Sequence, residues 1–172
     1  MRTSIIIVLV LIFGITTKSQ SHFLGDTLIK TISVFDNDTI YKYVNFDGEF
    51  NELPRPRTAA GQIPEPVVFN YKPKSLIINS IKEIFNPKEI DELIESKCSV
   101  QCISTSTGKV ESVSFMFAER EPEICFNKFV SLSQKIKEKL TIETEFNMEI
   151  EEGGYVLSTN PLYVELKREL SH

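Results

Sequence analysis

Two stretches near the N-terminus, residues 27–35 and 39–46, are rich in β-branched and aromatic side chains. They are separated by Asp36-Asn37-Asp38, whose short polar side chains favour a turn because they hydrogen-bond their own backbone. This pattern predicts a β-hairpin within residues 22–50. Four prolines follow between positions 51 and 66. Because proline cannot donate to a sheet interior, residues 51–74 are predicted to form a Pro-rich connector.

Apolar residues then recur at spacings of three and four in three stretches, which predicts amphipathic helices. The first stretch begins near residue 75. The second has Asn86 as N-cap, Pro87 at the first helical position and Glu89 at the third, the pattern of a capping box. The third is predicted to begin at Glu121-Pro122. Its buried stripe would consist of Phe126, Phe129, Val130, Ser133, Ile136 and Leu140.

Between the second and third of these helices, alternating residues predict a central hairpin. Its strands are 98–103 and 110–117, and Gly108 in the turn is free to adopt a positive φ. A final strand is predicted over 155–166, after two glycines and with an interruption at Asn160-Pro161. The order of elements predicts an α+β fold, in which a small antiparallel sheet packs on two or three helices. Residues 75–172 would form this domain, and the N-terminal hairpin would be added to it.

Residues 141–152 are acidic and irregular, with five glutamates. Clustered carboxylates could hold a hard cation such as calcium, but their spacing matches no calcium-binding loop. A solvated loop or an edge strand is the favoured interpretation.

Residues 1–21 have the pattern of a secretory signal peptide. Arg2 is the only charge before the apolar run 5–13, which is about half of the roughly 20 residues that a membrane-spanning helix requires. Polar residues follow, and cleavage after Gln20 or Ser21 fits this pattern. An uncleaved membrane anchor is the alternative. We therefore expect an exported protein, located in the periplasm or at the cell surface, that meets the membrane only during export.

The composition excludes several classes of function. The net charge is −5, and no cluster of lysine and arginine offers a surface for nucleic acid. The only histidines are His22 and His172, so the body of the chain lacks the commonest general base and zinc ligand. There is also no glycine-rich phosphate loop. We expect no catalytic residues, no metal and no cofactor. A hydrolase that works through two carboxylates is the least favoured alternative.

The three cysteines leave two interpretations open. Cys98 and Cys102 lie on one face of a predicted strand, ~14 Å apart, which exceeds the span of about 7 Å between Cα atoms in a disulfide. Cys125, at the start of the covering helix, could form a disulfide with Cys98 or Cys102 in an oxidising compartment. Alternatively, all three are buried thiols that behave as small apolar side chains, which we favour slightly.

The hairpin also contains short glycosylation motifs. Asn37-Asp38-Thr39 is an N-x-T acceptor. Asp26-Thr27-Leu28 and Asp38-Thr39-Ile40 resemble the Asp-Thr-aliphatic motif that Bacteroidetes use for O-glycosylation of exported proteins. Asn37, Thr27 and Thr39 are therefore candidate modification sites.

Several short motifs occur in a characteristic order between residues 86 and 166. A helix that begins Pro87-Lys88-Glu89 leads into a hairpin with Gly108-Lys109-Val110-Glu111-Ser112-Val113, then a second helix and the segment 160–166. In this order the chain resembles the C-terminal domain of TonB-type energy transducers, especially divergent forms common in Bacteroidetes. The long Pro-rich spacer of a transducer is absent. The resemblance therefore implies the fold and its mode of recognition rather than energy transduction.

In that family an extended peptide pairs with an exposed strand edge, where backbone hydrogen bonds supply affinity. The resemblance implies a corresponding edge here, formed by Tyr155, Val156, Leu157, Ser158 and Thr159, with Pro161 limiting further pairing. An ordinary protected edge is the alternative. The sequence thus predicts a non-catalytic domain that binds a protein or peptide of unknown identity. A structural or accessory component of an envelope complex, contacting its partner through the N-terminal hairpin, is a second possibility.

Overall fold

The computed structural model describes residues 27–35, 38–45 and 50–171. The predicted signal peptide, both histidines and Asn37 lie outside these residues. In this part of the chain, no helix combines the length and apolar character needed to cross a membrane. The elements in chain order are β1 (Ile29–Phe35), β2 (Asp38–Val44), the 3-10 helix η1 (Phe50–Glu52), β3 (Pro66–Lys72), α1 (Leu76–Ile84), α2 (Pro87–Glu95), β4 (Cys98–Thr105), β5 (Val110–Phe117), α3 (Phe126–Lys139), β6 (Thr141–Phe146), β7 (Tyr155–Asn160) and α4 (Leu162–Leu170).

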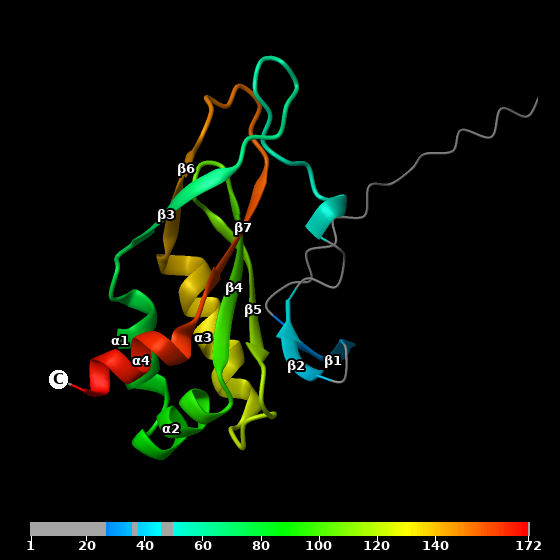
Figure 1. The fold of residues 1–172 in the computed structure, drawn as a ribbon. Helices are drawn as coiled ribbons and strands as arrows, with labels where there is room; N and C mark the ends of the chain where they lie inside the picture. Colours follow the sequence, from blue (N-terminus) through cyan, green and yellow to red (C-terminus); the bar gives the residue numbers. More distant parts are fainter. Residues whose placement is uncertain (1–26, 36–37, 46–49, 172) are drawn as a thin grey trace, which may run out of the picture.

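The main sheet has five strands in the order β1-β2-β5-β4-β7, and every neighbouring pair is antiparallel. A second, two-stranded antiparallel sheet pairs β3 with β6. Figure 1 shows α1, α3 and α4 on the same side of the main sheet, with the β1–β2 hairpin at the far end of the sheet from β7. The predicted α+β fold, with its antiparallel sheet, packed helices and added N-terminal hairpin, is confirmed.

The core lies between the main sheet and α3. Alternate residues of β4 and β5 face this core because successive strand side chains point to opposite faces, and Val100, Val113, Phe115 and Phe117 are buried. Phe129 of α3 lies at the centre of the aromatic packing. Its ring meets those of Tyr43, Phe85, Phe115 and Phe117 edge to face, with centroids 5.0, 5.5, 5.2 and 5.5 Å apart. A single side chain therefore joins α3 to α1 and to two strands of the sheet.

The predicted capping box at the start of α2 is present. The Asn86 side chain accepts from the backbone N–H of Glu89 at 3.0 Å, and the Glu89 carboxylate accepts from the backbone N–H of Asn86 at 2.8 Å. Glu89 also accepts from Lys128 Nζ at 2.5 Å, which connects α2 to α3. The Lys128 ammonium is the main cause that holds the pKa of the Glu89 carboxyl below its usual value. Local capping and a tertiary ion pair thus act on the same side chain.

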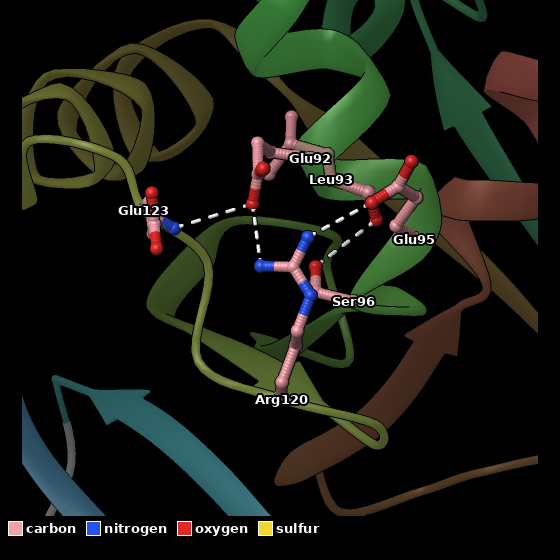
Figure 2. Close-up of polar contacts among 6 residues, drawn as sticks. All are labelled: Glu92, Leu93, Glu95, Ser96, Arg120 and Glu123. Carbon is pink, nitrogen blue, oxygen red and sulfur yellow. Dashed lines mark hydrogen bonds and ion pairs between the residues drawn. The ribbon is translucent and has the colours of Figure 1, made fainter.

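The third helix begins later than predicted, at Phe126 rather than near Glu121, because Arg120 holds the preceding loop against α2 (Figure 2). The Arg120 guanidinium donates to Glu92 at 2.6 Å and to Glu95 at 2.9 Å. The backbone N–H of Glu123 donates to the same Glu92 carboxylate at 3.3 Å. The hydrogen bond from Arg120 lowers the pKa of the Glu92 carboxyl. This ion-pair cluster is explained by its structural role, which is to anchor the loop between β5 and α3.

The final predicted strand is wrong beyond Asn160. Residues 162–170 form helix α4, and Leu162 and Leu166, four residues apart, are buried on its inner side. The segment 160–166 was expected to form a strand like the closing strand of TonB-type domains. After Pro161 it instead forms a helix. The predicted connector 51–74 also contains a strand, β3, and the acidic stretch 141–152 begins with its partner β6. The edge-strand interpretation of that acidic stretch is confirmed for residues 141–146.

Candidate functional site

Strand β7 is the last strand in the order of the main sheet, and it pairs with β4 on one side only. The backbone N–H of Tyr155 donates to the carbonyl of Pro54 at 2.8 Å, so it is directed away from β4. In an antiparallel ladder, alternate residues direct their N–H and C=O groups to the same side. The backbone groups of Leu157 and Thr159 therefore also point away from β4. The predicted residues Tyr155 to Thr159 do lie at a sheet edge, and their role in binding stays a prediction.

The connector covers the N-terminal end of this edge. Besides the bond between Tyr155 and Pro54, the backbone of Gly154 lies directly against residues 54–56. Gly154 also accepts a hydrogen bond through its carbonyl from the N–H of Ser106 in the β4–β5 turn, at 2.8 Å. The exposed part of the edge is therefore shorter than the strand, and its outward backbone groups are those of Leu157 and Thr159.

A cavity of about 430 Å³ lies at the C-terminal end of the edge, among β3, the start of α1, α4 and the last residue of β7. Its lining combines apolar and aromatic side chains with polar groups. The apolar part includes Phe69, Tyr71, Ile77 and Ile78, and the polar part includes Lys74, Asn160, Glu165, Arg168 and Glu169. Burial raises the pKa of the Tyr71 phenol, so this side chain remains a neutral hydroxyl near pH 7. The cavity can thus accept a ligand that has both an apolar and a polar part.

The acidic and basic side chains of this cavity differ in whether they have partners within the protein. The Glu165 carboxylate accepts from Asn160 Nδ2 at 3.1 Å, and Glu169 pairs with Lys82 at 3.0 Å. In contrast, no ion pair or side-chain hydrogen bond joins Lys74 or Arg168 to another residue of the described chain. The cavity therefore offers two cations, while Glu169 is paired with Lys82 and Glu165 keeps its negative charge, because its hydrogen bond comes from a neutral amide.

Asn160 adds an unsatisfied acceptor. Only 8% of this residue is exposed, and its Oδ1 atom has no hydrogen-bond partner among the described residues. A buried polar atom without a partner costs about 1–3 kcal/mol relative to one that is hydrogen-bonded. Oδ1 is itself enclosed by the protein, so a ligand N–H or O–H would recover this energy only if the Asn160 amide turned toward the cavity.

The disulfide that the sequence left open, between Cys125 and Cys98 or Cys102, is not formed in the structure, where all three thiols are free. Cys98 and Cys102 are buried in β4 on the core face, whereas Cys125 is exposed as the N-cap residue of α3. The alternative of buried thiols therefore describes Cys98 and Cys102 only. Burial raises the pKa of the Cys98 thiol, and that of Cys102 to about 12, so neither is a reactive thiolate near neutral pH.

We expect one fast-reacting thiol per molecule in the native protein. A disulfide-exchange reagent with a chromophoric leaving group should modify Cys125 first and reach Cys98 and Cys102 only after unfolding, because both are enclosed in the core. In Cys125→Ser the fast phase should disappear, while the slow phase in denaturant should be unchanged. Rapid modification of folded Cys125→Ser would contradict the burial of the two strand thiols.

Of the three candidate glycosylation sites, Thr27 and Thr39 lie at the N-terminal hairpin, apart from β7. Thr27 is exposed and Thr39 is half-buried, while Asn37 lies outside the described residues. Glycosylation at these positions stays a prediction. Among the residues that the structure describes, no group of three or more histidine, cysteine, aspartate or glutamate side chains is arranged to hold a metal ion.

The sequence pattern predicted the strand and the resemblance placed it at an edge, but neither indicated the cavity beside it. Tyr71 and Lys74 fall in the segment predicted to be a connector, and Arg168 lies beyond the last predicted strand. Helical spacing in Leu162 and Leu166 could have indicated α4 and with it one wall of the cavity. Nothing local in the sequence indicates that β3 and α1 lie against that wall.

Comparison with known proteins supports the fold. No family model matches the chain, and no curated protein matches it. Among solved structures, the chain is similar to a DUF5043 family protein from Bacteroides uniformis, with a TM-score of 0.56 and 13% identity over 81% of this chain and 87% of that chain. At this level of identity the similarity concerns the fold alone, and it extends over most of both chains.

Proposed function

We propose that this protein is an exported, non-catalytic domain of the cell envelope that binds a peptide or protein segment by pairing with the edge of β7. The observation that carries this proposal is the outward direction of the Leu157 and Thr159 backbone groups on the outermost strand. An extended peptide laid along such an edge forms backbone hydrogen bonds with it, and its alternate side chains supply specificity.

The composition of β7 also supports this role. Edge strands are commonly protected from pairing by charged side chains, prolines or bulges. The strand Tyr155–Asn160 contains no charged residue and no proline, and its register with β4 is regular. Protection is confined to its two ends, where Pro54 of the connector and Pro161 lie. The middle of the strand therefore remains a suitable template for a short peptide.

Export and the absence of catalysis rest on sequence features. The pattern of residues 1–21 supports secretion into the periplasm or to the cell surface. The order of helix, hairpin and helix in residues 86–140, the part of the resemblance to TonB-type C-terminal domains that α4 does not contradict, supports recognition of a partner rather than chemistry on a substrate. The histidine-free body of the chain agrees with this interpretation.

Leu157→Pro tests the proposal because proline removes the outward N–H but leaves the inward-facing residues of the β4–β7 ladder in place. The probe is an array of short synthetic peptides of mixed sequence, tethered through their N-termini. We expect the wild-type protein to bind a subset of them, and Leu157→Pro to bind that subset about tenfold more weakly. Leu157→Ala is the control, since it shortens the side chain and keeps the N–H, and it should retain most of the affinity.

Equal binding by wild-type protein and folded Leu157→Pro would rule out pairing at this edge. So would the failure of the wild-type protein to bind any peptide of the array. Circular dichroism of each variant would establish that it is folded.

The N-terminal hairpin supports a second candidate function, that of a structural or accessory component of an envelope complex. Ile32 and Val34 are 64% and 67% exposed and lie on the same face of β1, which is the other edge strand of the sheet. Apolar side chains exposed together on an edge strand indicate a contact surface. The same peptide array separates the two functions. If the double variant Ile32→Ser, Val34→Ser loses binding to the array while Leu157→Pro keeps it, the hairpin rather than β7 is the contact surface.

A further inference from the structure

The cavity beside β7 continues the edge of the strand. Asn160 is both the last residue of β7 and part of the cavity lining. In Figure 1, α4 extends from the lower end of β7 toward α1, and both helices contribute residues to the cavity lining. A chain that is extended along β7 toward Asn160 would therefore end near the cavity.

The charges of the cavity favour a ligand carboxylate. Lys74 and Arg168 have no ion-pair partner in the described chain, and Glu169 is paired with Lys82. Only Glu165, whose hydrogen bond comes from the neutral Asn160 amide, sets a negative charge against these two cations. A guanidinium binds a carboxylate through parallel N–H donors, and an ammonium adds a point charge. The cavity thus complements an anionic group of the size of a carboxylate.

The uncharged residues of the lining indicate which groups of the ligand lie next to that carboxylate. Asn160 Oδ1 is a buried acceptor without a partner, and it would receive one N–H if the Asn160 amide turned toward the cavity. The side chains of Phe69, Tyr71 and Ile77 offer an apolar surface that suits an aliphatic or aromatic side chain. A carboxylate, an N–H donor and an apolar side chain occur together in the last residue of a peptide.

We propose that this cavity binds the free C-terminal residue of a peptide that pairs with β7, an inference that rests on the proposed function. The terminal carboxylate would bind Arg168 and Lys74, a backbone N–H of the peptide would donate to Asn160 Oδ1, and the last side chain would lie against the apolar lining. Because the cavity is at the Asn160 end of β7, the peptide runs parallel to that strand.

The test uses the peptides of the array that bind wild-type protein. Each is synthesised in two forms, with a free C-terminal carboxylate and with a C-terminal amide, and affinities are measured by calorimetry. The free acid should bind at least about tenfold more tightly than the amide, because only the acid can form the charge-assisted hydrogen bonds. Arg168→Gln and Lys74→Gln should each reduce this preference and leave the affinity for the amide unchanged.

Lys167→Gln is the matched control. It removes one positive charge from the residue next to Arg168, on the same helix, at an exposed position outside the cavity lining. The preference for the free acid should persist in this variant. Its loss in Lys167→Gln would attribute the preference to the overall charge of α4 and would overturn the inference.

The outcomes separate the inference from the function on which it rests. If acid and amide bind equally and Leu157→Pro weakens both, the peptide pairs with β7 but its terminus is not bound in the cavity, and only the inference fails. The inference also fails if an amide that ends in aspartate binds as tightly as the free acids, because a side-chain carboxylate would then be the ligand. If no peptide binds wild-type protein, the proposed function and the inference both fail.

Discussion

Replacing Phe129 with alanine is expected to destabilise the protein by about 3–5 kcal/mol, the usual range for removing a fully buried aromatic ring. The Phe129 ring is enclosed on all sides and packs edge to face on Tyr43, Phe85, Phe115 and Phe117. These neighbours come from β2, the end of α1 and β5, so no single element can move inward to fill the space. The free energy of unfolding in urea would measure the loss.

Phe126→Ala is the control for this prediction because it makes the same substitution on the same helix, one turn earlier. The Phe126 ring is only half-buried and stacks edge to face on Tyr43. We expect it to cost less than half as much as Phe129→Ala. Similar losses in the two variants would mean that the aromatic packing is not centred on Phe129.

The parts of the fold that could be predicted from sequence are those set by neighbouring residues. The turn residues at 36–38 and 104–109 indicated both hairpins, and the register of each is set by its own turn. The start of α2 was equally local, because Asn86, Pro87 and Glu89 satisfy the first backbone N–H groups of the helix without help from the rest of the protein. In such segments the sequence pattern and the tertiary structure agree.

Strand β3 could not be predicted in this way. It begins with Pro66 and follows a proline-rich segment, which indicates a connector. Its partner β6 lies in the acidic stretch, much later in the sequence. The pairing of Tyr71 with Ile142 therefore joins residues that are far apart along the chain. The stabilising contact is therefore non-local.

Helix α4 was missed for another reason. Residues 162–166 alternate sufficiently to resemble a strand, and the same residues place Leu162 and Leu166 at helical spacing. A short apolar run fits both the two-residue period of a strand and the 3.6-residue period of a helix. The helix is the observed conformation, and it buries both leucines against the rest of the fold. The cavity depends on both β3 and α4, so it could not be predicted, although the strand beside it could.

Replacing Gly154 with alanine is expected to destabilise the protein by about 1–3 kcal/mol, the usual cost of forcing atoms into a packed site. A Cβ atom at this position would lie 2.4 Å from the carbonyl carbon of Arg55 and 2.5 Å from the nitrogen of Pro56. Both are backbone atoms, so the connector itself must move. Since Tyr155 donates to the Pro54 carbonyl, this movement should break the bond that covers the N-terminal end of β7.

Two measurements check this expectation. Urea unfolding gives the loss of stability, and amide hydrogen exchange should show faster exchange at Tyr155 with little change at Val156, which faces β4. Gly153→Ala is the matched control, because a Cβ there would meet only the side-chain oxygen of Ser106, which can move at the cost of its long hydrogen bond, 3.3 Å, from the Gly154 N–H. Unchanged protection of Tyr155 in Gly154→Ala would show that the connector does not hold this end of the strand.

Gly154→Ala also bears on how the edge is limited. The connector occupies one backbone position of β7 that a peptide could otherwise use, and α4 begins just beyond the opposite end. If the connector occupies the edge in place of a peptide, its displacement should free the Tyr155 N–H and lengthen the part of β7 that a peptide can pair with. A peptide extended by one pair of residues at its N-terminus should then gain affinity in Gly154→Ala relative to Gly153→Ala, whereas the preference for a free C-terminus, set at the other end of the strand, should not change.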